Sequence, residues 1–70
     1  MGETNMRSWL VAIRKSKKMT QRSVAQSAGI SRAYYTQIEL STRNPSVRVA
    51  IMIANLLEFN WTVFYNASDE

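Results

Sequence analysis

The sequence has no cysteine and no histidine, and it contains only one proline and two glycines. The lack of cysteine excludes disulfides and thiolate metal sites, and without either residue the usual nucleophilic triads cannot be built. The five acidic residues are scattered, with no pairing typical of general acid–base catalysis or magnesium binding. We therefore expect no enzymatic activity, no cofactor and no metal.

Long apolar runs are also missing. No stretch approaches the roughly 18 uninterrupted apolar residues of a membrane-spanning helix. The first residues, MGETNM, have no apolar core of the kind found in signal peptides. These features predict a cytoplasmic protein without membrane contact.

Positive charge is concentrated in the first two-thirds of the chain. Residues 1–48 hold all nine Lys and Arg with two acids, which is nine minus two or +7, whereas residues 49–70 hold three acids and no base, or −3. A basic N-terminal part and an apolar, mildly acidic C-terminal part suit a protein that binds a polyanion with one surface and a protein with another. The alternative is an ordinary charged surface that keeps a small domain soluble.

Apolar residues recur at helical spacing throughout, and no segment alternates as a strand would. The sequence therefore predicts a compact all-α domain over residues 6–65, between a flexible arm (1–5) and a frayed tail (66–70). Each predicted helix follows a capping residue. The caps and helices are Asn5 before a helix to about Lys17, Thr20 before Gln21–Ser27, Ser31 before Arg32–Leu40, Ser46 before Val47–Leu57, and Asn60 before Trp61–Tyr65.

Two of these helices show which side faces the core. The first presents Met6, Trp9, Leu10 and Ile13 on one apolar face, and the fourth presents Val47, Ala50, Ile51, Ile53, Ala54 and Leu57.

The run from Gln21 to Leu40 is the most informative segment. Two short helices that cross over a tight turn must approach closely, which favours a small residue on the first helix and a residue that tolerates positive φ at its end. The run supplies both, together with a second apolar stripe and a polar, basic outer face. This order predicts a helix-turn-helix, which places its second helix in the major groove of DNA. The residues concerned are Val24, Ala25, Ala28, Gly29, Ser31, Tyr35 and Ile38.

With these helices in place, the chain resembles the Cro/C1-type (Xre-like) helix-turn-helix family of phage repressors and related bacterial regulators. The resemblance covers about Leu10 to Phe64 and implies a five-helix, lambda-repressor-like domain. It rests on Arg14, Met19-Thr20-Gln21, Val24-Ala25, Gly29-Ile30-Ser31, Ile38-Glu39, Asn44-Pro45-Ser46, Ile53-Ala54 and Leu57.

The resemblance also implies roles for individual residues. Arg14 and Glu39 match a partly buried salt bridge that ties the first helix to the third. Base edges are read from the exposed side of the third helix, and phosphates are held by residues around it. The base-reading positions are Arg32, Ala33, Thr36 and Gln37, and the phosphate-contacting positions are Gln21, Ser31, Arg43 and Asn44.

Several of these residues have simpler interpretations. Arg32 can be a solvated surface arginine and Ala33 only a good helix former. Tyr34 and Tyr35 together can indicate base stacking as in RNA-binding proteins. Because Tyr35 falls on the inner stripe, we expect it in the core, with the Tyr34 hydroxyl near a phosphate.

The chain departs from the family pattern after Glu39. The family often carries a polar residue and then glycine there, whereas this sequence has Leu40 and Ser41. We therefore expect a differently built exit from the third helix, with Leu40 touching a thymine methyl, the core or a protein partner.

The expected function is a sequence-specific, double-stranded-DNA-binding transcriptional regulator, a small phage- or bacterial-type repressor. A domain of this size covers little DNA, so we expect a weak homodimer on a two-fold operator. The alternative is a protein-binding module of the same fold, an antitoxin or antirepressor that acts through its apolar C-terminal third. The expected dimer contact, whose members can instead be ordinary exposed apolar residues, is Met52, Leu56, Trp61 and Tyr65.

Overall fold

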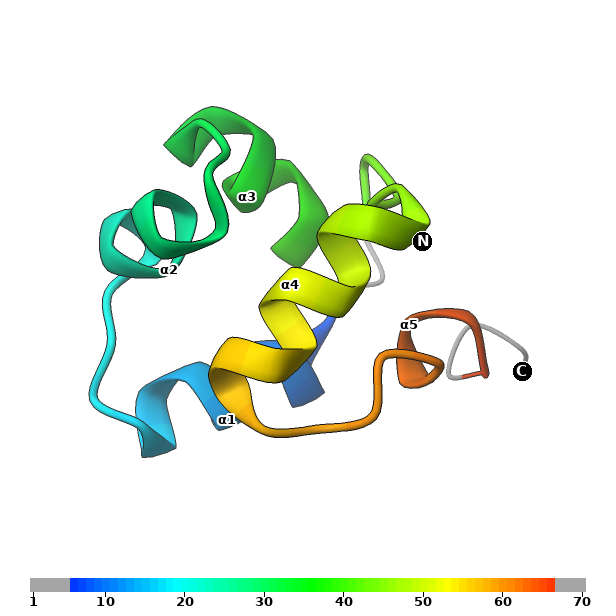
Figure 1. The fold of residues 1–70 in the computed structure, drawn as a ribbon, viewed down its shortest axis with the longest axis horizontal. Helices are drawn as coiled ribbons and strands as arrows, with labels where there is room; N and C mark the ends of the chain where they lie inside the picture. Colours follow the sequence, from blue (N-terminus) through cyan, green and yellow to red (C-terminus); the bar gives the residue numbers. More distant parts are fainter. Residues whose placement is uncertain (1–5, 67–70) are drawn as a thin grey trace.

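Five α-helices make up most of residues 6–66, the part of the chain that the computed structural model describes (Figure 1). The all-α prediction is confirmed. No helix within these residues is long and apolar enough to cross a membrane. The helices are α1 (Ser8–Ser16), α2 (Gln21–Ala28), α3 (Arg32–Glu39), α4 (Val47–Leu57) and α5 (Val63–Asn66).

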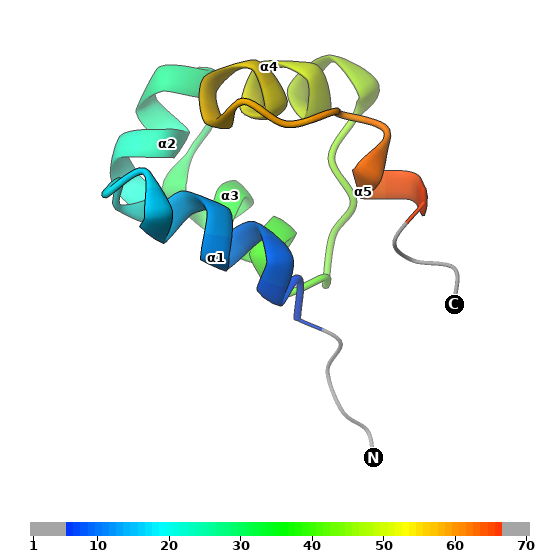
Figure 2. The same cartoon turned by 90° about the horizontal axis from the view of Figure 1, so that it is seen from below.

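One apolar core joins the helices. α2 packs against both α3 and α4, and α1 packs against α3. In Figure 2, α4 and α1 lie on opposite sides of the view with α3 seen between them. Tyr35 is fully buried, as expected from its place on the inner stripe, so its ring is not available for base stacking. The core consists of Leu10, Val24, Ala25, Ala28, Tyr35, Ile38, Ala50, Ile53, Leu57 and Phe64.

Three helices begin at the predicted caps. In each case the side-chain hydroxyl oxygen accepts a hydrogen bond from a backbone N–H in the first turn, which satisfies one of the donors left free at a helix start. The pairs are Thr20 with Ser23 (3.0 Å), Ser31 with Tyr34 (3.0 Å) and Ser46 with Val49 (3.2 Å).

The prediction for the start of α1 is wrong. The helix begins at Ser8, and the capping position is Arg7, which makes no side-chain cap. The physical reason is that the backbone N–H of Arg7 donates to the Glu39 carbonyl (2.8 Å), so this part of the chain is bonded to the end of α3. Met6 consequently precedes the helix and is 48% exposed, not packed on an apolar face. Asn5 lies outside the described residues.

Smaller differences concern the other helices. α3 ends one residue earlier than predicted, at Glu39. α5 begins at Val63 because Trp61 and Thr62 form a turn, and it includes Asn66, which the sequence assigns to the tail. Val47, expected in the core, is 53% exposed on the first turn of α4. The remainder of the predicted arm and tail, residues 1–5 and 67–70, lies outside the described part.

At the C-terminus of α3, Ser41 takes the place of the glycine that is common in the family. Ser41 adopts a left-handed conformation with φ 62°, the conformation that glycine occupies at many helix ends. Its N–H donates to the Ile38 carbonyl (3.2 Å), and the Thr42 N–H donates to the Gln37 carbonyl (3.1 Å). This is a Schellman motif, so the helix is closed in the usual way at the cost of a strained serine.

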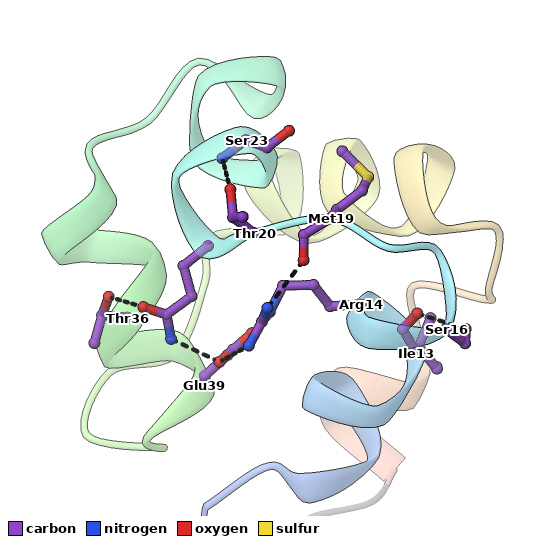
Figure 3. A network of polar contacts seen from close by, with 9 residues as sticks. Ile13, Arg14, Ser16, Met19, Thr20, Ser23, Thr36 and Glu39 are labelled. Carbon is purple, nitrogen blue, oxygen red and sulfur yellow. Dashed lines mark hydrogen bonds and ion pairs between the residues drawn. The ribbon is translucent and has the colours of Figure 1, made fainter.

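A buried polar network ties α1, α2 and α3 together (Figure 3). Arg14 reaches from α1 and donates through Nε to Glu39 Oε2 (2.7 Å) and through Nη1 to the Met19 carbonyl (3.0 Å). Gln21 Nε2, from α2, donates to Glu39 Oε1 (2.8 Å), and its Oε1 accepts from the Thr36 hydroxyl (3.1 Å). The geometry confirms a salt bridge between Arg14 and Glu39.

Glu39 carries its negative charge in this buried place because of these donors. Its side chain is 3% exposed, and burial alone would raise the pKa of its carboxyl group. The hydrogen bond and charge of Arg14, the nearby Tyr35 hydroxyl and the hydrogen bond from Gln21 together more than offset this, so the pKa of Glu39 lies below its ordinary value. Ionised Glu39 therefore stabilises the fold.

This network predicts how stability depends on pH. Glu39→Gln leaves the buried Arg14 without its counter-charge, so we expect the free energy of unfolding near pH 7 to fall by about 3 kcal/mol. Because the pKa of folded Glu39 is lowered, its contribution is fully present above about pH 4.3, the ordinary glutamate pKa. The contribution is lost as the pH falls through the folded pKa, so the two proteins should converge in acid.

The measurement is urea unfolding of both proteins between pH 7 and pH 3. Glu58→Gln is the matched control, because Glu58 pairs with Lys17 (2.6 Å) on the exposed surface and should change stability little. A stability difference between the wild-type protein and Glu39→Gln that stays constant across this pH range would contradict the account.

Candidate nucleic-acid interface

The outer side of α3 is a polar face open to solvent. Arg32, Ala33 and Gln37 are exposed, and Thr36 is half-buried. Residues four apart lie one above the other on a helix, so these four positions form two adjacent rows on one face. The structure therefore brings together all four residues predicted to read base edges.

Ser31 caps the N-terminus of α3. The Ser31 oxygen is occupied by the Tyr34 N–H, which leaves the exposed Ser31 hydroxyl hydrogen available as a donor. A donor at a helix N-terminus suits an anion such as a phosphate, because the backbone N–H groups there carry partial positive charge.

Gln21 and Thr36 are bonded to each other through their side chains. The half-buried Gln21 amide bridges Thr36 and Glu39. These bonds fix the position of Gln21 at the start of α2. One amide hydrogen remains on Gln21 Nε2 for an external acceptor, since an amide nitrogen has two and only one bonds Glu39.

Tyr34 of α3 and Arg43 of the following loop form a second pair of contacting residues. The guanidinium of Arg43 lies over the Tyr34 ring, 4.8 Å from its centroid. The Tyr34 hydroxyl oxygen accepts from the backbone N–H of Ser46 (3.3 Å). The cation–π contact therefore holds the exposed Arg43 next to α3. The Tyr34 hydroxyl keeps its hydrogen for donation, as a phosphate contact would require.

Asn44 is bound by an arginine that the sequence did not single out. Arg7 Nη2 donates to Asn44 Oδ1 (2.8 Å), and Arg7 Nη1 donates to the Ile38 carbonyl. The two residues of the Arg7–Asn44 pair are 37 positions apart, and a lone arginine before an apolar segment carries no local signal of such a contact. The exposed Arg22, next to Gln21, adds positive charge at the start of α2 and was also not singled out.

The predicted dimer residues lie on α4 and around α5. Met52, Leu56 and Trp61 are half-buried and pack against the core of their own domain, whereas Tyr65 is 41% exposed. Trp61 and Tyr65 contact each other edge to face, with ring centroids 5.8 Å apart. Figure 1 shows α5 at the side of the molecule remote from α2. These residues thus leave part of an aromatic surface exposed, on the side of the molecule away from α2.

Known proteins share this architecture. Residues 10–64 match the model of a helix-turn-helix family, HTH_3. The HTH-type transcriptional regulator YqaF of Bacillus subtilis is 52% identical over 60 residues, which cover 86% of this chain and 79% of YqaF. The regulator YqaE of the same organism is 44% identical over 45 residues, 64% of this chain. The crystal structure of an HTH_3-family transcriptional regulator from Vibrio cholerae superimposes with a TM-score of 0.70 at 28% identity over 93% of this chain.

Two of these proteins are much longer than the matched region. The chain spans 39% of YqaE and 36% of the Vibrio cholerae regulator. The match to the family model nevertheless extends from α1 to α5 and covers at least part of every helix described above. The chain belongs to the HTH_3 family of helix-turn-helix transcriptional regulators.

Proposed function

We propose that this chain binds double-stranded DNA sequence-specifically through the exposed face of α3. The observation that carries the proposal is the arrangement of Arg32, Ala33 and Gln37, which face solvent on a helix whose inner side is locked to α1 and α2. An arginine at the start of a recognition helix suits guanine O6 and N7, and glutamine suits adenine N6 and N7. The small Ala33 allows the helix to approach the bases.

Phosphate contacts would supply most of the affinity. Gln21, Ser31, Tyr34, Arg43 and Asn44 surround the α3 face and present donors or positive charge. Such contacts fix the orientation of a protein on the duplex without reading its sequence. They also make the affinity depend strongly on salt, because each neutralised phosphate releases counterions.

We further propose that the protein acts as a repressor that binds a two-fold operator as a weak homodimer. One recognition helix reads only a few base pairs, so useful specificity requires two copies. The partly exposed Trp61–Tyr65 pair, with Met52 and Leu56, is the proposed two-fold contact. Half-sites would then be about one helical turn, roughly 10 base pairs, apart. A dimer bound there represses by occupying DNA that the transcription machinery needs.

Arg32 and Arg43 should have separable roles on DNA. Arg32→Ala should weaken binding to the preferred site by about 1–3 kcal/mol and relax preference at one or two base positions, because it removes a base contact. Arg43→Ala should weaken binding to all duplexes alike and reduce the salt slope by about one, because it removes a phosphate contact. Fluorescence anisotropy with preferred and random duplexes, at several salt concentrations, measures both. Equal loss on both duplexes for both variants would refute this assignment.

Trp61 should matter mainly when two copies bind. Trp61→Ala should weaken binding to a two-half-site operator far more than binding to an isolated half-site, because only the former needs the dimer contact. Phe59→Ala is the matched control, since Phe59 packs on Trp9 (5.4 Å between centroids) and Phe64 (5.6 Å) of its own domain. The control should affect both duplexes equally. If Trp61→Ala does the same, Trp61 belongs to the domain core and the dimer proposal fails.

A further inference from the structure

Arg7 is a buried cation whose acceptors are unusual. Its residue is 9% exposed, and burial lowers the pKa of its guanidinium. Buried charges are normally paired with an opposite charge. Among residues 6–66, however, Arg7 has no carboxylate partner, and its three acceptors are two backbone carbonyls and one side-chain amide.

All of these acceptors lie at the end of α3 or in the loop that connects it to α4. Arg7 Nη1 donates to the carbonyls of Ile38 and, at 3.4 Å, of Arg43, and Nη2 donates to Asn44 Oδ1 (2.8 Å). The last carbonyls of a helix carry partial negative charge, which a cation stabilises. Arg7 therefore caps the recognition helix from outside and bonds the loop to it.

The guanidinium is supported from its other side by α5. It lies over the Phe64 ring, 5.5 Å from the centroid, and Phe64 is itself 2% exposed. In addition, the Tyr65 hydroxyl donates to the carbonyl of Pro45 (3.2 Å), which follows Asn44 in the loop. The loop is therefore held both from the start of α1 and from α5.

The chemistry of the pair fixes the orientation of Asn44. A guanidinium has only donors, so it must face the oxygen of the Asn44 amide. The amide nitrogen then points away from Arg7, and Asn44 is exposed. A phosphate oxygen is an acceptor and requires a donor. Arg7 thus makes Asn44 present to solvent the group that a phosphate needs.

We propose that Arg7 is a positioning residue for DNA binding: it orients the Asn44 amide and fixes the loop that carries Arg43, so that both meet the phosphate backbone. This role rests on the proposed function. Arg7 touches no DNA itself and acts through Asn44 and the loop backbone. Its effect is therefore independent of DNA sequence, unlike that of Arg32.

The test is a double-mutant cycle on DNA affinity. Arg7→Met keeps an apolar side chain beside Phe64 and the backbone bond to Glu39, but it removes every side-chain donor. We expect it to weaken binding to preferred and random duplexes by the same factor, about tenfold. Asn44→Ala should also weaken both, and the double variant should lose much less than the product of the single losses, because Arg7 acts through Asn44. Lys15→Met, which removes one exposed charge from α1, is the control, and its loss should multiply with that of Asn44→Ala.

Stability is separated from positioning in two ways. Affinities are compared at a temperature where circular dichroism shows each variant fully folded, and Arg7→Lys, which keeps the charge and a donor, serves as the milder variant. The NMR signals of the Asn44 side-chain amide should shift in Arg7→Lys, because one ammonium cannot reproduce the guanidinium fork. A role confined to stability would leave the affinity of folded protein unchanged.

The outcomes separate the two proposals. If the wild-type protein binds duplex DNA with salt dependence but the folded Arg7 variants bind equally well, the role of Arg7 is refuted and the proposed function stands. Multiplicative losses of Arg7→Met and Asn44→Ala refute it as well. If the wild-type protein binds no duplex, the proposed function and the role of Arg7 fall together.

Discussion

The ion pair between Arg14 and Glu39 is the interaction on which the arrangement of this domain depends. Glu39 is the last residue of α3, and its carboxylate receives Arg14 from α1 and Gln21 from α2. A buried carboxylate with both oxygens bonded fixes distance and angle at once, since a shift of any helix would leave a buried charge unpaired. The exposed side of α3 therefore has a defined orientation relative to the other two helices.

Arg7 and Arg14 extend this constraint to the loop after α3. The two arginines lie seven positions apart, at the start and near the end of α1, and both bond to the C-terminal part of α3 or the loop that follows it. Arg14 of α1 thus holds α3 through the Glu39 carboxylate, and Arg7, just before α1, holds the end of α3 and its loop through carbonyls and an amide. Through Phe64, Arg7 also reaches α5, where the proposed dimer contact lies. The proposed DNA-binding and dimer-contact parts of the molecule are consequently linked by one buried cation.

The features that could be predicted from the sequence are those that depend on residues close together in the chain. The caps at Thr20, Ser31 and Ser46 and the bounds of α4 followed from residue type and periodicity, and the Arg14–Glu39 pair followed from the family resemblance. The start of α1 was not predictable, because Arg7 is held there by the end of α3, more than thirty positions away. The left-handed conformation of Ser41 was not predictable either, because serine does not favour positive φ. This conformation depends on hydrogen bonds to the preceding helix. The roles of α3 residues on DNA remain predictions.

The central claim is that the exposed face of α3 reads a DNA sequence. The most direct measurement is selection of bound fragments from a pool of random duplex DNA, carried out with the purified chain at physiological salt. The account predicts enrichment of a two-fold sequence whose half-sites are centred about 10 base pairs apart. It also predicts that the same selection with Arg32→Ala loses preference at one or two positions of each half-site while the rest persists. A wild-type pool that remains random after repeated rounds would contradict the claim.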